Sequence, residues 1–161
     1  MSLITCITKA NGDGCNLKKF KGYSSKISSD LGNVKKEVED IISYLRESYA
    51  SLTEDTVFET RVVLNELIIN AIKHGNKEDP CKHIMIDICV DDMGYAEFTL
   101  EDEGKGYDHK IQKCADINKQ SDLCELNETG RGLIIVTSLC DSVIFNDAGN
   151  RIVVRKKLNI K

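Results

Sequence analysis

The chain lacks several features that would assign it to a protein class at once. It contains a single proline, Pro80, so glycine and asparagine must punctuate its elements. No apolar run approaches the roughly 20 residues that a transmembrane helix needs, so we expect no membrane partner. The N-terminal MSLITCITKANGDG has no basic start followed by an apolar stretch, and it does not resemble a secretory signal. These absences together predict a cytoplasmic protein.

Clustered positive charge is also scarce. The 161 residues include 22 Lys and Arg against 26 Asp and Glu, which gives a net charge of −4. Direct binding of nucleic acid needs clustered basic residues, and we interpret the few near 151–161 as an ordinary charged strand end. We therefore expect no direct nucleic-acid partner. A hydrophobic content of 41% is sufficient for the core of one domain at this length.

The seven cysteines form no CxxC pair, which argues against a zinc ribbon and against a thioredoxin-type motif. An odd number of cysteines also argues against a disulfide framework. His74, Cys81, His83 and Cys89 lie close together in the sequence, but their spacing matches no set of metal ligands. We interpret the cysteines as reduced thiols that serve mostly as small apolar residues.

Apolar residues at helical spacing predict three helices. The first begins at the N-cap Asn33 and ends near residue 49. The second begins at the N-cap Thr53 and runs to residue 74, with Gly75 as its C-terminal cap. A shorter apolar helix is expected over 130–140. Each stripe of apolar residues is expected to face a core.

Five segments have the pattern of strands, and the last four are expected to form two hairpins: 23–28, 83–90, 95–101, 142–145 and 151–158. Antiparallel strands with helices on one face make an α+β two-layer sandwich. Residues 1–21 contain a turn signal and are expected to form an N-terminal extension, either a hairpin or a loose arm. Residues 22–161 then form the domain, with a polar lid at about 107–128.

One polar stripe lies on the second predicted helix, within the segment NELIINAIKHG. Glu66 and Asn70 share a face because they are one helical turn apart, and Lys73 and His74 continue it. This stripe is either an ordinary solvent-facing surface or a site. In a site, the Asn carbonyl oxygen suits a hard cation such as Mg²⁺, and the Glu can orient or deprotonate a nucleophile. The opposite face is expected to be core: Leu64, Leu67, Ile68 and Ala71.

A carboxylate followed by closely spaced glycines comes directly after the first hairpin. Asp102 at the strand end precedes Gly104 and Gly106, whose freedom allows a flat ligand to approach the backbone. A buried carboxylate there can accept a hydrogen bond from the exocyclic amine of adenine. The alternative is a plain surface turn.

Another glycine pair opens the last predicted helix, in the segment Glu128-Thr129-Gly130-Arg131-Gly132. Free N–H groups at a helix start attract anions, so this segment is either a phosphate contact or a flexible hinge. No GxxxxGK[ST] and no GxSxG occurs, which argues against a P-loop and against an α/β-hydrolase elbow.

Taken in order, these segments resemble the N, G1 and G2 boxes of the GHKL (histidine-kinase-like) ATPase superfamily. Within it, the chain is most similar to the anti-sigma-factor serine/threonine kinases. The resemblance is carried by "NELIINAIKHGN", "DEGKGYD", "ETGRGLIIVTSLCDSV" and the final "GNRIVVRKKL", and it covers roughly residues 22–158. It implies a Bergerat-type ATP-binding sandwich with a mixed, mostly antiparallel sheet. The family often has a proline soon after the G1 box, where this chain has Asp108-His109.

The resemblance also implies roles for individual residues. Glu66 would be the catalytic base, and Asn70 would be the ligand of Mg²⁺. Asp102 would bind the adenine amine, with Gly104 and Gly106 lining the base pocket.

The remaining implied ligands of ATP lie near its phosphates. They come from the end of the N box and from the G2 box: Lys73, His74, Thr129, Gly130, Arg131 and Gly132. Backbone groups of the G2 box would contact the phosphates, and Arg131 would add charge. Lys73 and His74 would touch the phosphates or the lid.

The resemblance finally implies an activity. The chain would be an ATP/Mg²⁺-dependent protein serine kinase that phosphorylates a STAS-type anti-anti-sigma partner. As a homodimer, it would also sequester a sigma factor. An alternative is a nucleotide-gated binding module that binds ATP without kinase turnover. A third possibility is a structural α+β protein in which the boxes are coincidental, and it predicts no ATP binding.

Overall fold

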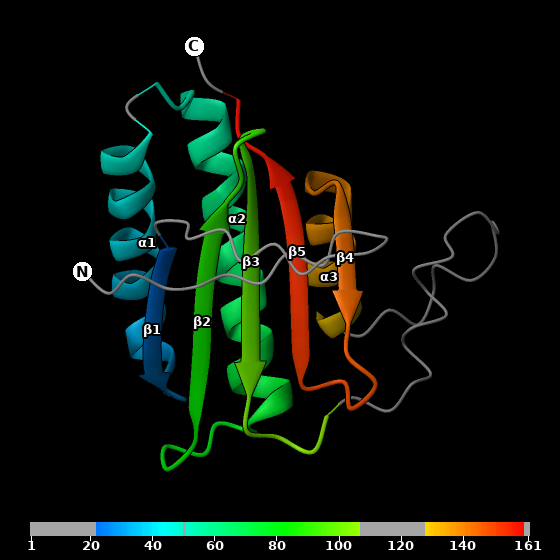
Figure 1. The fold of residues 1–161 in the computed structure, drawn as a ribbon. Helices are drawn as coiled ribbons and strands as arrows, with labels where there is room; N and C mark the ends of the chain where they lie inside the picture. The colour runs from blue at the N-terminus through cyan, green and yellow to red at the C-terminus, as the bar shows by residue number, and fades with distance from the viewer. Residues whose placement is uncertain (1–21, 50, 107–127, 160–161) are drawn as a thin grey trace, which may run out of the picture.

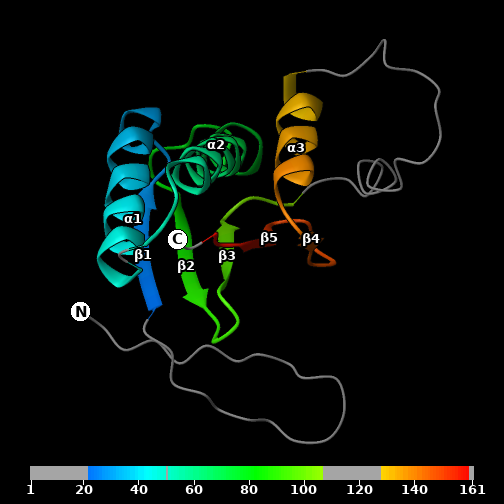
Figure 2. The same ribbon diagram turned by 90° about the horizontal axis from the view of Figure 1, so that it is seen from above.

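The computed structural model describes residues 22–49, 51–106 and 128–159, and these form two layers. Figure 1 shows a five-stranded sheet with the helices behind it, and Figure 2 shows that the helices lie on one face. The strand order is β1-β2-β3-β5-β4, and every described pairing is antiparallel. The strands are β1 (Gly22–Ser28), β2 (His83–Val90), β3 (Tyr95–Asp102), β4 (Ser142–Phe145) and β5 (Arg151–Lys157). The predicted α+β sandwich is confirmed, and its described sheet contains no parallel pair.

The helices follow the predicted order. A 3₁₀ turn (Leu31–Asn33) leads into α1 (Val34–Ser48), and α2 (Glu54–Asn70) continues into a π-helical turn (Ala71–Gly75). The last helix is α3 (Glu128–Leu139). The arm expected at 1–21 lies outside the described residues, and so does the lid expected at 107–128, apart from its last residue.

The core lies between the sheet and the helices. Alternate residues of β2 point toward the helices, and Ile84, Ile86 and Ile88 are each 0% exposed. Phe98 lies opposite Ile88 in the register of β3 and is equally buried. The apolar stripes expected in the first two helices are confirmed as buried, except that Tyr49, expected at the end of the first stripe, is only half-buried. The buried residues are Val34, Val38, Ile41, Ile42 and Leu45 in α1, Leu64, Leu67 and Ile68 in α2, and Ala71 in the π-helical turn.

The two predicted N-caps have different outcomes. Thr53 caps α2, since its hydroxyl accepts a hydrogen bond from the N–H of Thr56 at 3.2 Å. Asn33 occupies the N-cap position of α1 as predicted, but its side chain makes no capping hydrogen bond. A 3₁₀ turn precedes α1, and Asp30 caps that turn by accepting from the N–H of Gly32. The Asn33 amide instead donates to the hydroxyl of Ser28 at 2.9 Å.

Gly75 ends the second helix, but not for the predicted reason. The left-handed conformations belong to Lys77 (φ 59°) and Glu78 (φ 57°), so Gly75 is not a C-terminal cap of the left-handed type. The helix ends through a π-type hydrogen bond, in which the N–H of Asn76 donates to the carbonyl of Ala71 at 2.8 Å. Such π-turns occur often at functional sites.

Two further observations concern the cysteines and membrane association. Cys81 and Cys140 are free thiols, and burial raises the pKa of the Cys140 thiol to about 11. Cys89 is disulfide-bonded, so the expectation of reduced thiols is corrected at that position. Within the described ranges, no helix has both the length and the apolar character needed to cross a membrane.

Candidate functional site

The residues expected to bind a nucleotide gather at one end of the molecule. The end of α2, the start of β2, the end of β3 and the turn between β4 and β5 lie together at the lower end of Figure 1. Because neighbouring strands are antiparallel, the C-terminus of β3 lies beside the N-termini of β2 and β5. The site is therefore built from residues that are far apart in the sequence.

Asp102 is the last residue of β3 and lies on the sheet face that the helices cover, where it is 7% exposed. Burial raises the pKa of its carboxyl group. The N–H of Gly104 donates to its Oδ1 at 2.8 Å, and the charges of Lys82 and Lys77 act in the opposite direction to burial. A carboxylate held in this way is oriented to accept hydrogen bonds from a ligand.

The N box and the G1 box contact each other through glycines. A β carbon on Gly75 would lie 2.6 Å from Oδ1 of Asp102, and one on Gly104 would lie at the same distance from that atom. A β carbon on Gly104 would also collide with the carbonyl oxygen of Gly75. Any larger side chain at either glycine would therefore displace the carboxylate or the backbone.

The turn between β4 and β5 supports the G1 box, which the sequence analysis did not foresee. The N–H of Asp102 donates to the carbonyl of Asn150 at 2.9 Å, and the Asn150 amide donates to the carbonyl of Asp102 at 3.1 Å. Gly106 has φ +80°, and a β carbon there would overlap the carbonyl oxygen of Ala148. The only local signal was a turn sequence, which gave no indication of its tertiary contact.

The N box also contacts the G2 box, at the opposite side of the candidate site. Gly132 is buried in α3, and a β carbon there would collide with Oε2 of Glu66 and lie 3.5 Å from Nδ2 of Asn70. Glu66 and Asn70 are both half-buried on α2. The structure therefore brings together the two residues that we expected to act at the phosphates and the glycine that follows them in the motif order.

Helix α3 is also attached to the rest of the domain at its other end. The ammonium group of Lys156, a residue 5% exposed, donates to Glu59 at 2.6 Å and to the carbonyl of Leu139 at 2.8 Å. Glu59 lies on α2, so this lysine joins α2, the C-terminus of α3 and β5. A cation at a helix C-terminus is favourable for the helix dipole.

The remaining predicted ligands lie at the edges of this region. Lys73 is exposed and His74 is half-buried in the π-helical turn. Arg131 is exposed on α3. Thr129 and Gly130 belong to the first turn of α3, and their side chains lie outside what the structure describes.

The donor set at this end of the molecule fits ATP and Mg²⁺ chemically. An amide oxygen and a carboxylate one turn apart are hard oxygen ligands of the kind that Mg²⁺ prefers. The buried Asp102 carboxylate, bordered by two glycines, matches a flat base that carries an amine. Asn70 and Glu66 would therefore face the metal and phosphates, and Asp102 would face the base.

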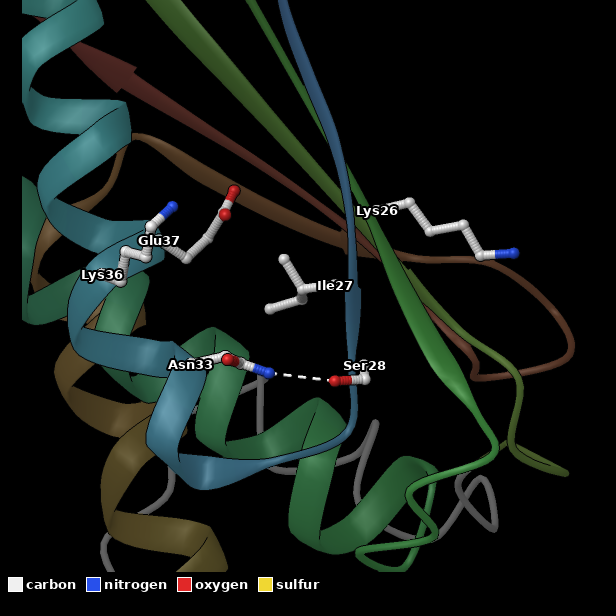
Figure 3. Close-up of a pocket in the computed structure, with 6 residues that line it drawn as sticks. All are labelled: Lys26, Ile27, Ser28, Asn33, Lys36 and Glu37. Atoms are coloured by element: carbon white, nitrogen blue, oxygen red, sulfur yellow. Dashed lines mark hydrogen bonds between the residues drawn. The ribbon is translucent and has the colours of Figure 1, made fainter.

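A cavity of about 240 Å³ lies elsewhere, between β1 and the start of α1. Figure 3 shows Ile27 and Glu37 pointing into this space, while Lys26 extends away from it. The Asn33–Ser28 hydrogen bond closes one side. None of the residues that we expected to bind ATP lines this cavity.

Comparison with known proteins connects this geometry to a family. The model of the histidine kinase-like ATPase domain matches residues 27–156. The chain belongs to the histidine kinase-like ATPase family. This confirms the resemblance drawn from the boxes, and membership implies ATP binding at the level of the family.

Two kinds of relative share part of the sequence. The chain is 30% identical over 117 residues to the anti-sigma F factor of Heyndrickxia coagulans, a match that covers 68% of this chain and 75% of the relative. It is 27% identical over 108 residues to the serine-protein kinase RsbW of Staphylococcus aureus strains JH9 and Newman. That match covers 63% of this chain and 66% of the relative. Among histidine kinase-like ATPases, the chain is therefore similar to anti-sigma factors and a serine-protein kinase.

Proposed function

We propose that this chain is an ATP- and Mg²⁺-dependent protein serine kinase that acts as an anti-sigma factor. The observation that carries the proposal is the packing of Gly132 against Glu66 and Asn70. A carboxylate and a side-chain amide lie there beside the first turns of α3. In the proposed site they would serve as a base and a metal ligand, and the N–H groups at the start of the helix would bind phosphate.

The roles of the residues follow from their positions. Asp102 accepts a hydrogen bond from the adenine amine, and Gly104 and Gly106 leave room for the base. Asn70 holds Mg²⁺, which when bound neutralises phosphate charge. Glu66 accepts the proton of the attacking serine hydroxyl.

The G2 box and the end of the N box complete this assignment. Thr129, Gly130, Arg131 and Gly132 bind the phosphates from the start of α3. Lys73 and His74 approach the phosphates from the π-helical turn. These assignments extend the family's ATP binding to individual residues of this chain.

Partners and setting belong to the same proposal. The name of one relative, anti-sigma F factor, supports a sigma factor as a partner, and the name of the other, a serine-protein kinase, supports a protein substrate. We propose that this substrate is a STAS-type anti-anti-sigma protein. We propose that the chain acts as a homodimer in the cytoplasm.

The test of this function is phosphate transfer from γ-labelled ATP to a candidate anti-anti-sigma protein. Wild type should yield a phosphoserine, and chelation of Mg²⁺ should abolish it. Glu66→Ala should lower transfer by at least about a hundredfold, which is typical of a lost general base. Glu47→Ala is the matched control, because Glu47 is exposed on α1. Unchanged transfer by Glu66→Ala would refute the role of Glu66.

The same experiment distinguishes the kinase from a binding module without turnover. If Asn70→Ala abolishes ATP-dependent binding of the partner while wild type never forms a phosphoprotein, the chain is a nucleotide-gated binding module. A kinase predicts both partner binding and a phosphorylated product.

A further inference from the structure

Asn76 is the last residue of the N-box segment NELIINAIKHGN and is 0% exposed, although asparagine usually lies at the protein surface. Complete burial of an amide is unfavourable unless hydrogen bonds replace its contacts with water. None of the roles that we assigned to the three boxes uses the side chain of Asn76. Core packing alone therefore does not explain why an asparagine occupies this buried position.

The side chain of Asn76 joins the ends of two strands. Its Nδ2 donates to the hydroxyl oxygen of Ser29 at 2.6 Å and to the carbonyl of His83 at 2.8 Å. Since the carbonyl of His83 can only accept, the atom facing it must be the amide nitrogen. Ser29 follows β1 and His83 begins β2, so the amide links the end of the N box to the edge of the sheet.

The backbone of Asn76 holds the chain on both sides of the same point. Its N–H closes the π-type bond to Ala71, and its carbonyl accepts from the N–H of Asp79 at 3.3 Å. Lys77 and Glu78, which lie between, both have the left-handed conformation that non-glycine residues rarely adopt. Such backbone persists only where surrounding contacts hold it in place.

Gly75, the residue before Asn76, is the one that presses against the Asp102 carboxylate and Gly104. Asp102 pairs with Ile84 on β2, next to His83. The hydrogen bonds of Asn76 therefore attach Gly75 to the same strand that positions Asp102. A shift of Gly75 would change the space beside the carboxylate.

We propose that Asn76 is a positioning residue for base recognition: through Ser29 and His83 it holds Gly75 against Asp102 and sets where an adenine amine meets the carboxylate. The inference rests on the proposed ATP site. Asn76 does not touch the nucleotide in this account, and it acts through Gly75.

The test compares two nucleotides that differ at the group Asp102 would bind. ATP carries an exocyclic amine at C6, and inosine triphosphate carries a carbonyl there. Calorimetry on the full chain gives a dissociation constant for each, and their ratio measures recognition of the amine. Wild type should prefer ATP, and Asn76→Ala should reduce this preference about tenfold, as expected when one polar contact is misaligned. A merely structural role would lower the melting temperature and leave the ratio unchanged.

Two further variants keep the result interpretable. Asn65→Ala is the matched control, because Asn65 is a half-buried asparagine on α2 whose amide donates to the carbonyl of Arg61 at 2.8 Å. Its ratio should equal that of wild type. Ser29→Ala removes only one acceptor of the Asn76 amide, and it decides the question if Asn76→Ala does not fold. It should reduce the preference by a smaller factor.

The outcomes separate the inference from the function on which it rests. If wild type binds neither nucleotide, or binds both equally, the proposed ATP site is wrong and the inference fails with it. If wild type prefers ATP and the folded variants of Asn76 and Ser29 keep that preference in full, only the inference is wrong. A reduced preference in these variants, together with an unchanged Asn65→Ala, supports it.

Discussion

The two ends of the candidate site differ in what their glycines touch. At the base end, Gly104 lies against the backbone carbonyl of Gly75, and Gly106 lies against that of Ala148. At the phosphate end, Gly132 lies against the side chains of Glu66 and Asn70. A backbone carbonyl fixed in a strand or helix end cannot move alone, whereas a glutamate side chain can rotate. Gly75 and Gly104 also lie against the Asp102 carboxylate, so the base end combines backbone and side-chain contacts, whereas the atoms nearest to Gly132 all belong to side chains. We therefore expect the base end to tolerate change less readily than the phosphate end.

The way each end is attached to the domain shows the same contrast. Side-chain hydrogen bonds hold the base end directly. Asn150 donates to the carbonyl of Asp102 itself, and Asn76, the residue after Gly75, donates to Ser29 and to His83. The phosphate end depends on where α3 lies, and Lys156 holds that helix at its far end. In the proposed ATP site, a base end held by backbone would favour specificity, and a phosphate end lined by side chains that can rotate would suit a reaction that must release its product.

The largest effect is expected at the base end, from Gly104→Ala. The new methyl group would collide with the carbonyl of Gly75, which has no free rotation to relieve the clash. We expect a loss of about 1–3 kcal/mol in the free energy of unfolding and no measurable ATP binding. Thermal melting and calorimetry measure both. Gly32→Ala is the control, because its nearest neighbour is the side chain of Asp30, at 3.3 Å. Unchanged ATP affinity in Gly104→Ala would contradict the proposed difference between the base end and the phosphate end.

At the phosphate end, Gly132→Ala should affect activity more than stability. Glu66 can rotate away from the new methyl group, and alanine is favoured over glycine in a helix by about 1 kcal/mol. We expect a small change in melting temperature, and a fall in phosphate transfer of about a hundredfold because the base is misplaced. Quench assays of transfer at saturating ATP measure the second effect. Loss of the folded state in this variant would show that the phosphate end is as fixed as the base end.

Lys156→Met tests the anchoring of α3. It removes the donor to Glu59 and to the carbonyl of Leu139, and should lower the free energy of unfolding by about 1–3 kcal/mol. The rate of phosphate transfer should fall several-fold more than the ratio of the affinities for ATP and inosine triphosphate. The reason is that only the phosphate end depends on the position of α3. Lys35→Met, at an exposed position of α1, should change neither quantity. Equal losses at both ends would argue against separate attachment.

The smallest effect concerns pH and the free protein. Burial raises the pKa of Asp102 in the folded state above its ordinary value of 3.8, so the folded state binds this proton more tightly than the unfolded state does. This contribution to stability is complete below the unfolded pKa and is lost as pH rises through the folded pKa. The amide introduced by Asp102→Asn does not titrate. As the pH rises above 3.8, wild type should therefore lose stability relative to this variant, and the difference between their melting temperatures should change. A difference that stays constant as the pH rises would show that burial does not perturb Asp102.

Local patterns predicted most of the elements. Alternation of Ile84, Ile86 and Ile88 defined β2 at both ends, and the Thr53 cap is confirmed. Asn33 is the N-cap residue of α1 as predicted, but it makes no capping hydrogen bond, because a 3₁₀ turn with its own cap at Asp30 leads into the helix. The bounds of a strand and the cap of a helix depend on interactions within a few residues. Sequence patterns predict them well where those residues can form only one local structure.

The sequence predicted the three boxes of the candidate site. It did not predict the tertiary contacts that hold these boxes in place. Gly75 was expected to end a helix, whereas its lack of a side chain serves a contact with Asp102. Asn76 reaches Ser29, and Asn150 reaches Asp102, across long stretches of sequence. Such tertiary hydrogen bonds leave no periodic signal. A polar residue at the end of the N box and an asparagine that closes a turn were the only hints available.

The central claim is that the three boxes form one ATP site, and calorimetric titration of ATP with Mg²⁺ tests it most directly. Wild type should bind ATP at a single saturable site. Asp102→Asn, at the base end, and Asn70→Ala, at the phosphate end, should each weaken binding at least about tenfold, as loss of a hydrogen bond to a charged group or of a metal ligand would. Absence of binding by wild type, or unchanged affinity in both variants, would contradict the claim.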